Sequence, residues 1–280
     1  MTARRLEGKV AFITGAARGQ GRSHAVRLAQ EGADVIAIDL MDGVGTVGYP
    51  LATQEDMDET VRLVEALDRR IIASKTDVRD SAALKAAVDD GVAQLGRLDI
   101  VLANAGIASF APVEDLSDEM WDDMIDINLT GVFKTVRAAV PHLRAGGNGG
   151  AIVLTSSTAG IKGMAILAHY VAAKHGVVGL MKTLANELAP DMIRVNSVHP
   201  TSVDTMMIHN EQTYSVFRPD KAPSEVTRED VSESFHGLNA LPIQWVDPVD
   251  ISNAILWLVS DDARYVTGVQ LPVDAGSVVK

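Results

Sequence analysis

A tyrosine and a lysine one helical turn apart are the residues best suited to acid–base chemistry in this sequence. Tyr170 and Lys174 occupy positions i and i+4 of a segment with a helical pattern, so their side chains should share a face. A free tyrosine has a pKa of about 10, which a nearby ammonium group lowers by favouring the phenolate. A tyrosine poised in this way can take the hydroxyl proton of an alcohol as hydride leaves, or return the proton to a ketone.

A serine and an asparagine earlier in the chain could complete this arrangement. Ser157 follows a predicted strand, and its hydroxyl group could orient a substrate oxygen and stabilise the charge that develops on it. Asn128 lies in a predicted helix and could hold a water molecule that connects Lys174 to solvent, or it could be an ordinary polar residue there. Tyr-x-x-x-Lys occurs by chance in many helices, so the pair gains weight only from the other motifs around it.

A glycine-rich segment follows the first predicted strand and opens the first predicted helix. Its glycines, Gly15, Gly19 and Gly21, have the spacing G-x-x-x-G-x-G and surround Arg18 and Gln20. Glycines allow a tight turn and close approach of the backbone to a pyrophosphate, and the helix N-terminus supplies free N–H groups and a partial positive charge. An ordinary glycine-rich turn is the alternative, but the position between strand and helix favours a dinucleotide-binding loop.

An aspartate at the end of the second predicted strand bears on which dinucleotide would bind. The Asp39 carboxylate could accept hydrogen bonds from the adenosine ribose hydroxyls, and it would repel a 2′-phosphate. Asp39 could also be only a turn residue, since aspartate favours such positions. Arg18 could help to hold the 2′-phosphate of NADP, but a carboxylate facing that phosphate should outweigh one flexible arginine. We therefore predict NAD as the cofactor.

Short β-rich runs alternate with long amphipathic runs along the chain. The β-rich runs are almost continuously apolar, as expected for a parallel sheet covered by helices on both faces. The predicted strands are Val10–Thr14, Val35–Asp39, Ile71–Lys75, Ile100–Ala103, Ile152–Thr155, Val195–Val198 and Val269–Val273. The predicted helices are Gly21–Glu31, Glu55–Asp68, Ser81–Leu95, Asp118–Leu143, Ala168–Leu188 and Pro248–Val259. This alternation predicts an α/β fold: one domain, residues 1–280, with a Rossmann-like doubly wound parallel sheet of about seven strands.

Two segments do not fit this alternation. Residues 41–53 contain three glycines and a proline too close together for a helix, and we predict a loop insertion after the second strand. Residues 206–246 form a long stretch interrupted by prolines, which we predict to be irregular. Loops of this length are uncommon in compact domains unless they cover a site. Both segments follow strands, so we expect them at the ligand-binding edge of the sheet, with residues 206–246 as a substrate lid.

Composition and charge exclude several classes of function. The 280 residues carry a formal net charge of −12 and no cysteine. Nucleic acids and anionic membranes require basic surfaces, so we expect neither as a partner, and disulfides and thiolate metal sites are excluded. The histidines form no H-E-x-x-H motif and Ser157 lacks a G-x-S-x-G context, so we expect neither a metal nor a serine hydrolase. No run approaches the ~20 apolar residues of a membrane span, which favours a soluble, cytoplasmic protein.

With these motifs in this order, the chain resembles the short-chain dehydrogenase/reductase family from about Gly8 to Val273. The resemblance implies hydride transfer between NAD and an alcohol or ketone in a homotetramer, with the tyrosine and lysine also touching the cofactor. The matching positions are Gly15, Gly19 and Gly21 of the glycine motif, Asp77 and Val78, Asn104, Ala105 and Gly106, and the tetrad Asn128, Ser157, Tyr170 and Lys174.

The resemblance also implies that the segment after the sixth strand holds the nicotinamide. The family commonly has Pro-Gly at the start of this segment, whereas this sequence has Pro200 followed by Thr201. The missing glycine puts the course of the loop in doubt. Thr205 still matches the residue that bonds the carboxamide, and Pro200 and Val203 are expected beside the cofactor with it.

Three further segments resemble a narrower branch of the family. Residues 15–24, 49–53 and 267–276 are similar to the actinobacterial, mycofactocin-associated branch, whose members are often labelled carveol dehydrogenases. This resemblance implies that NAD is held tightly and is reoxidised by mycofactocin instead of exchanging. It also implies that the 41–53 loop is the feature that covers the cofactor.

The expected reaction is therefore oxidation of a secondary, apolar, cyclic alcohol of the carveol type. An NADPH-dependent 3-oxoacyl-carrier-protein reductase is an alternative that shares the tetrad and Arg18, but carrier proteins are acidic and so is this chain. A non-catalytic nucleotide-binding sensor is a second alternative, against which the intact tetrad counts. The apolar residues that could form the substrate wall, although any of them could belong to the core, are Met164, Ile166, Leu167, Met206, Met207 and Ile208.

Overall fold

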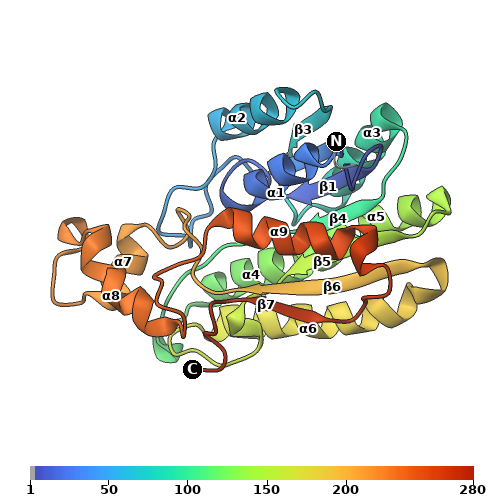
Figure 1. Cartoon of the computed structure of the whole chain (residues 1–280). Helices are drawn as coiled ribbons and strands as arrows, with labels where there is room; N and C mark the ends of the chain where they lie inside the picture. Colours follow the sequence, from blue (N-terminus) through green and yellow to red (C-terminus); the bar gives the residue numbers. More distant parts are fainter. Residues whose placement is uncertain (1–3) are drawn as a thin grey trace.

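Within residues 4–280, which the computed structural model describes, seven strands form one sheet in the order β3-β2-β1-β4-β5-β6-β7 (Figure 1). All neighbouring strands are parallel. This confirms the predicted α/β, Rossmann-like, doubly wound fold, and the predicted strand ends are correct to within one or two residues. The strands are β1 (Val10–Thr14), β2 (Asp34–Asp39), β3 (Ile71–Lys75), β4 (Ile100–Ala103), β5 (Gly150–Thr155), β6 (Ile193–Pro200) and β7 (Gln270–Val273).

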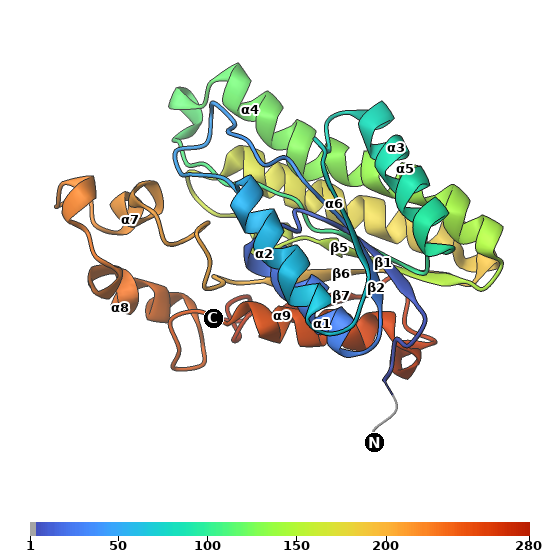
Figure 2. The same cartoon turned by 90° about the horizontal axis from the view of Figure 1, so that it is seen from above.

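Helices cover both faces of the sheet, as Figure 2 shows from above. One layer consists of α1 (Gly19–Gln30), α2 (Gln54–Glu65) and α9 (Pro248–Val259), and the other of α3 (Ser81–Leu95), α4 (Asp118–Ile125), α5 (Gly131–Gly146) and α6 (Ala168–Glu187). Successive side chains of a strand point to opposite faces, so each layer encloses its own apolar core. Phe12 of β1 packs in the α3–α5–α6 core, and its neighbour Ile13 packs in the α1–α2–α9 core.

The direction of winding reverses at β1, which pairs with β2 on one side and with β4 on the other. The chain segments after β1 and β4 therefore lead away to opposite faces and leave a crevice between them. Thr14 joins the two strand ends at the base of this crevice. Its Oγ1 atom accepts hydrogen bonds from the backbone N–H groups of Asn104 and Ala105, both at 3.0 Å.

A π-helical turn, Asp126–Thr130, interrupts the helix that was predicted over Asp118–Leu143 and separates α4 from α5. The prediction of one continuous helix was therefore wrong at this point. Hydrophobic spacing did not reveal the turn, because an apolar face continues on either side of it. Such turns are rare and frequently lie at functional sites, and Asn128 is fully buried in this one.

The segment 206–246 is not irregular as predicted, because it contains two helices, α7 (Glu211–Phe217) and α8 (Arg228–Leu238). Capping fixes their starts: Asn210 caps α7, and a capping box joins Thr227 to Asp230 at α8. A small apolar cluster around Phe235 and Trp245 holds the two helices together. They project from the side of the sheet in Figure 1. No helix within residues 4–280 is long and apolar enough to cross a membrane.

A buried histidine in the contact between α1 and α9 makes stability depend on pH. His24 is 0% exposed, its Nδ1 atom lies 2.8 Å from Ser252 Oγ of α9, and burial lowers its pKa from 6.5 to about 3. Between these values the unfolded chain binds a proton that the folded protein does not. Stability is therefore fully present above pH 6.5 and falls as pH decreases toward 3, by up to about 1.4 kcal/mol per pH unit.

We predict that His24→Asn, which keeps a polar atom near Ser252 and removes the titration, flattens the pH dependence of the unfolding free energy. Urea unfolding of both proteins at pH values between 4 and 7 measures this difference. The carboxylates titrate in both proteins, so their contribution cancels in the comparison. Parallel curves for the two proteins would show that His24 is already protonated in the folded state.

Candidate active site

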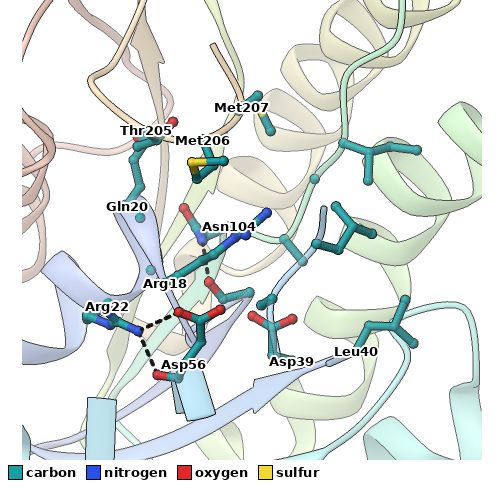
Figure 3. Close-up of a pocket in the computed structure, with 18 of the residues that line it drawn as sticks. Arg18, Gln20, Arg22, Asp39, Leu40, Asp56, Asn104, Thr205, Met206 and Met207 are labelled. Atoms are coloured by element: carbon teal, nitrogen blue, oxygen red, sulfur yellow. Dashed lines mark hydrogen bonds and ion pairs between the residues drawn. The ribbon is translucent and has the colours of Figure 1, made fainter. Parts of the chain in front are cut away.

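A cavity of about 440 Å³ lies at the carboxyl edge of the sheet, where β1, β2 and β4 end. In Figure 3, Asp39 lies at one end, Met206 and Met207 lie at the other, and Arg18 lies between them. The predicted cofactor residues that line it are Gly15, Arg18, Gly19, Gln20, Gly21, Asp39, Asp77, Val78, Asn104, Ala105, Gly106 and Thr205. The sequence motifs therefore line one cavity. The loops that follow the strands form one part of its wall, and Met206 and Met207 of the 206–246 segment form another.

The glycine-rich turn from β1 to α1 forms the floor of this cavity. Gly15 and Gly19 have positive φ angles of 67° and 55°, which residues other than glycine rarely adopt. A Cβ atom at Gly21 would lie 1.9 Å from the Gly15 carbonyl oxygen, so only glycine fits there. No side chain caps the start of α1, and the buried Oε1 atom of Gln20 has no partner in the described residues. The turn therefore presents unpaired polar groups to a ligand.

Asp39 and Arg18 are both held in place by backbone groups. Asp39 Oδ2 accepts a hydrogen bond from Ala17 N–H at 3.0 Å, and burial raises the pKa of this carboxyl group. Arg18 Nη2 donates to the carbonyl oxygen of Pro50, in the loop after β2. The arginine is thus engaged with this loop, which weakens the argument that it holds a 2′-phosphate.

Asp77 and Val78 lie on the far wall of the cavity, after β3. The Asp77 carboxylate is bound by the Arg79 guanidinium at 2.8 Å, and the same guanidinium pairs with Asp123 of α4 at 2.9 Å. Val78 is 8% exposed and packs against Gly131, where an added Cβ would approach its Cγ2 to 2.8 Å. These contacts lock the wall to the start of α5.

Asn128 fixes the segment after β4 instead of facing the cavity with its side chain. Its Oδ1 accepts from Ile107 N–H and its Nδ2 donates to the Ile107 carbonyl, both at 2.8 Å. The amide also contacts Met124 Sδ at 2.9 Å. These contacts tie the segment after β4 to the π-helical turn, and the expected role of Asn128 in holding a water between Lys174 and solvent stays a prediction.

Ser157, Tyr170 and Lys174 meet beside the cavity, at the junction of β5 and α6. Lys174 Nζ donates to the Thr155 carbonyl at 2.9 Å and lies 5.5 Å from the centre of the Tyr170 ring. Burial lowers the pKa of Lys174 to about 8 and raises that of Tyr170, and the Ser157 hydroxyl opposes the second effect by a hydrogen bond to the tyrosine. The three side chains that the sequence analysis grouped are therefore brought together.

The loop after β6 closes the other end of the cavity. Thr205 lies against the glycine turn, because a Cβ at Gly19 would be 3.4 Å from Thr205 Cγ2. Pro200, the last residue of β6, and Val203 are buried and do not line the cavity. Val203 instead pairs with Val246 in a short bridge that ties the two ends of the 206–246 segment. Although the common glycine is absent, Thr205 lines the cavity.

The 41–53 loop lies over the cavity and is anchored at three points. Tyr49, which is 7% exposed, accepts a hydrogen bond from Ala108 N–H at 3.2 Å, and burial raises its pKa to about 12. Thr46 donates to Asp123 Oδ2 at 2.8 Å, and Arg18 holds Pro50. We call this loop the strap. Tyr49 and Val44 of the strap line the cavity. Neither was predicted as a site residue, because a residue in a loop has no periodic pattern that shows which way its side chain points.

The predicted apolar wall is only partly gathered at the cavity. Met206 and Met207 line it, whereas Ile208 packs on the cluster that joins α7 and α8. The remaining three candidates, Met164, Ile166 and Leu167, are partly exposed in the turn before α6, close in sequence to Tyr170. The predicted apolar side chains thus lie on two different segments, of which only Met206 and Met207 line the cavity.

Comparison with known proteins places this arrangement in a family. The family described as short chain dehydrogenase matches residues 9–215. A (−)-trans-carveol dehydrogenase of Rhodococcus erythropolis is 59% identical over 99% of both chains. A crystal structure of carveol dehydrogenase from Mycobacterium avium in complex with NAD has a TM-score of 0.96 and 58% identity, with 99% of both chains covered.

A second solved structure, a short chain dehydrogenase from Mycobacterium paratuberculosis bound to NAD, has a TM-score of 0.91 and 47% identity and covers 99% of this chain and 100% of its own. These identities far exceed the level at which a family is shared, and the matches cover 99% of this chain. The chain therefore belongs to the short-chain dehydrogenase family.

Proposed function

We propose that the protein transfers hydride between NAD and a secondary alcohol or its ketone, with Tyr170 as the proton donor and acceptor. The observation that carries the proposal is the contact of Tyr170 with Ser157 and Lys174 beside the cavity whose floor is the glycine turn, where Lys174 Nζ lies next to the lining residue Gly106. Bound NAD would supply the hydride acceptor or donor. The chain itself supplies the orientation of the substrate oxygen and the movement of its proton.

The residues of the cavity fit a dinucleotide. The uncapped start of α1 offers N–H groups to a pyrophosphate, and the crowding at Gly21 leaves room only for backbone. The Asp39 carboxylate would accept hydrogen bonds from ribose hydroxyls and would repel a 2′-phosphate. With Arg18 held by Pro50, this combination favours NAD over NADP and disfavours the carrier-protein reductase alternative.

In the oxidation direction, Tyr170 accepts the alcohol proton while Ser157 orients the oxygen. The Lys174 ammonium, which has a pKa of about 8, favours the phenolate at neutral pH and loses this effect as pH rises through 8. Asn128, whose amide is bound to Ile107, is proposed to hold a water molecule that connects Lys174 to solvent. A nucleotide sensor would need none of these contacts.

The substrate that we propose is an apolar cyclic alcohol of the carveol type. Relatives at 58–59% identity over the whole chain are carveol dehydrogenases by name. Met206 and Met207 at the cavity, and the apolar turn before α6, would exclude water from such a substrate and bury its hydrocarbon surface.

The strap supports a further part of the proposal, in which NAD is held tightly and is reoxidised in place by mycofactocin. Three hydrogen-bonded anchors, at Arg18, Thr46 and Tyr49, must open before a dinucleotide beneath the strap can leave. Gly48 of the strap also packs on Gln212 of α7, with an added Cβ only 2.9 Å from its Oε1. The strap and the lid therefore brace each other.

We also propose that the protein acts in the cytoplasm as a homotetramer. Large apolar side chains are exposed on two separate parts of the surface, which a tetramer with two kinds of interface would cover. Trp121 and Phe133 lie on α4 and α5 and are 41% and 43% exposed, and Trp257 and Tyr265 lie on and just after α9 and are 38% and 83% exposed.

We predict that Tyr170→Phe lowers kcat for oxidation of carveol-like alcohols by about 10²–10⁴-fold, because the phenyl ring cannot carry the proton. Nucleotide binding should persist, since the ring itself remains. The matched control is Tyr265→Phe, which removes a hydroxyl from a side chain that is 83% exposed and far from the cavity. Steady-state rates with NAD and with an artificial electron acceptor measure the effect. An undiminished kcat in Tyr170→Phe would refute the proposed role of the tyrosine, whereas unchanged function of this variant in cells would favour the sensor alternative.

We predict that Asp39→Ala shifts the cofactor preference toward NADP by about 10²-fold in the ratio of kcat/KM values, because a like charge facing the 2′-phosphate is removed. Asp42→Ala is the control, since this exposed carboxylate makes the same change in net charge outside the cavity lining. Parallel assays with both nucleotides decide the point. An unchanged ratio in Asp39→Ala would mean that the backbone, not the carboxylate, sets the preference.

We predict that protein purified without added nucleotide releases NAD on denaturation, identified by its mass. Tyr49→Phe and Thr46→Val should each speed its dissociation by about tenfold, since each leaves one strap anchor unmade. Gly43→Ala, at a strap position with open space around it, should have no effect. Mass-spectrometric exchange of the bound nucleotide against isotope-labelled NAD gives the rates. An empty protein with rapid exchange in all variants would contradict the tight-cofactor proposal.

A further inference from the structure

A buried histidine behind Ser157 has no part in the proton transfer described above. His199 is the second-last residue of β6 and is 0% exposed. Its Nδ1 atom lies 2.8 Å from the Ser157 carbonyl oxygen, and its Nε2 atom lies 2.8 Å from Ser197 Oγ. Both ring nitrogens are therefore engaged, and one of them holds the backbone of the residue whose hydroxyl meets Tyr170.

The two partners determine which nitrogen of His199 carries the proton. A carbonyl oxygen can only accept, so Nδ1 must be the donor to Ser157. The Ser197 hydroxyl can donate to Nε2, which is satisfied when the ring is neutral. Burial lowers the pKa of His199. The hydrogen bond to Ser157 raises this pKa, and the nearby Lys174 ammonium lowers it. The imidazole is thus a fixed N–H donor.

The position of the contact explains why a side chain is needed there. The last backbone hydrogen bond between β5 and β6 is donated by Ser156, at 2.9 Å. One residue later the chain turns into a short 3-10 helix, so Ser157 has left the ladder of backbone hydrogen bonds. Its carbonyl accepts from Gly160 N–H at 2.9 Å and from His199 Nδ1 at 2.8 Å, which uses both lone pairs. Among residues 4–280, the His199 imidazole is the group of β6 that is hydrogen-bonded to Ser157.

A movement of the Ser157 backbone would move its hydroxyl group as well. Ser157 Oγ accepts from Ala159 N–H at 3.1 Å, within the same short helix, and also contacts the Tyr170 hydroxyl. If the anchor to β6 is lost, the whole turn can shift relative to α6, on which the tyrosine lies. A displacement of about 1 Å between reacting groups can cost about 10²-fold in rate.

We propose that His199 is a positioning residue for the reaction, which holds the Ser157 hydroxyl against Tyr170 through the Nδ1–H bond to the serine carbonyl. The proposal rests on the proposed roles of Ser157 and Tyr170. Ser197 has a supporting role, because its hydroxyl selects the tautomer in which Nδ1 carries the proton.

A matched pair of amide substitutions tests the proposal, because each keeps a different nitrogen of the ring. In His199→Asn the amide nitrogen lies near the place of Nδ1 and can still donate to Ser157, whereas in His199→Gln it lies near the place of Nε2 and cannot. We expect kcat for alcohol oxidation to fall by about 10- to 100-fold in His199→Gln and His199→Leu, and by no more than about threefold in His199→Asn. The KM values for the alcohol and NAD should change by less than about twofold, because the affected contact acts on the reacting groups.

Equal losses of kcat in the asparagine and glutamine variants would overturn the proposal, because packing alone would then explain the effect. A fully active His199→Leu protein would overturn it as well. If the leucine variant does not fold, the amide pair still decides, with thermal unfolding midpoints checking that both are native. Ser157→Ala is measured in parallel to distinguish the role of the serine from that of the histidine. A Ser157→Ala enzyme with undiminished kcat refutes the proposed role of the serine. A low kcat in Ser157→Ala together with an undiminished kcat in His199→Gln refutes only the role of His199.

Discussion

The common direction of the strands is the constraint on which the site depends. In a parallel sheet every strand ends at the same edge, so residues that follow β1, β2, β4, β5 and β6 lie near one another although they are far apart in sequence. The reversal of winding at β1 opens a crevice at that edge, and Thr14 fixes its base through two hydrogen bonds to the chain after β4. The glycine turn, Asp39 and the Ser157 turn take their places from this arrangement.

Buried polar groups around the crevice are paired with backbone in a way that makes the site rigid. An unpaired buried polar group is costly, so the bonds of Asn128 to Ile107, of Lys174 to Thr155 and of His199 to Ser157 each fix a loop as well as a side chain. The loops after β4 and β5 are thereby tied to helix or strand. The Oε1 atom of Gln20, in the glycine turn, is among the buried atoms with no partner in the described residues, and as an acceptor it suits a donor group of a ligand.

The strap and the α7–α8 segment enclose the crevice from two sides and touch each other through Gly48 and Gln212. Each has its own means of stability: the strap is held by hydrogen bonds and by the buried Val44 and Tyr49, and the helical segment by its own apolar cluster. The two differ in how they join the main cores, because Met41, Val44 and Ala52 of the strap belong to those cores, whereas the helical segment has a separate cluster. The α7–α8 segment can therefore move more easily than the strap, which suits a site that must admit a substrate but retain a cofactor.

The sequence by itself determined the sheet, most helix bounds and the motifs, because buried strands are continuously apolar and because glycine turns and the Tyr170–Lys174 pair depend on local spacing. Contacts between distant residues were decided only by the tertiary structure. The π-helical turn at Asn128, the two helices within 206–246, the bond from Arg18 to Pro50 and the engagement of His199 all depend on partners that no local pattern identifies. Hydrogen bonds of buried groups are satisfied by whatever the fold brings within about 3 Å, and that choice is made in three dimensions.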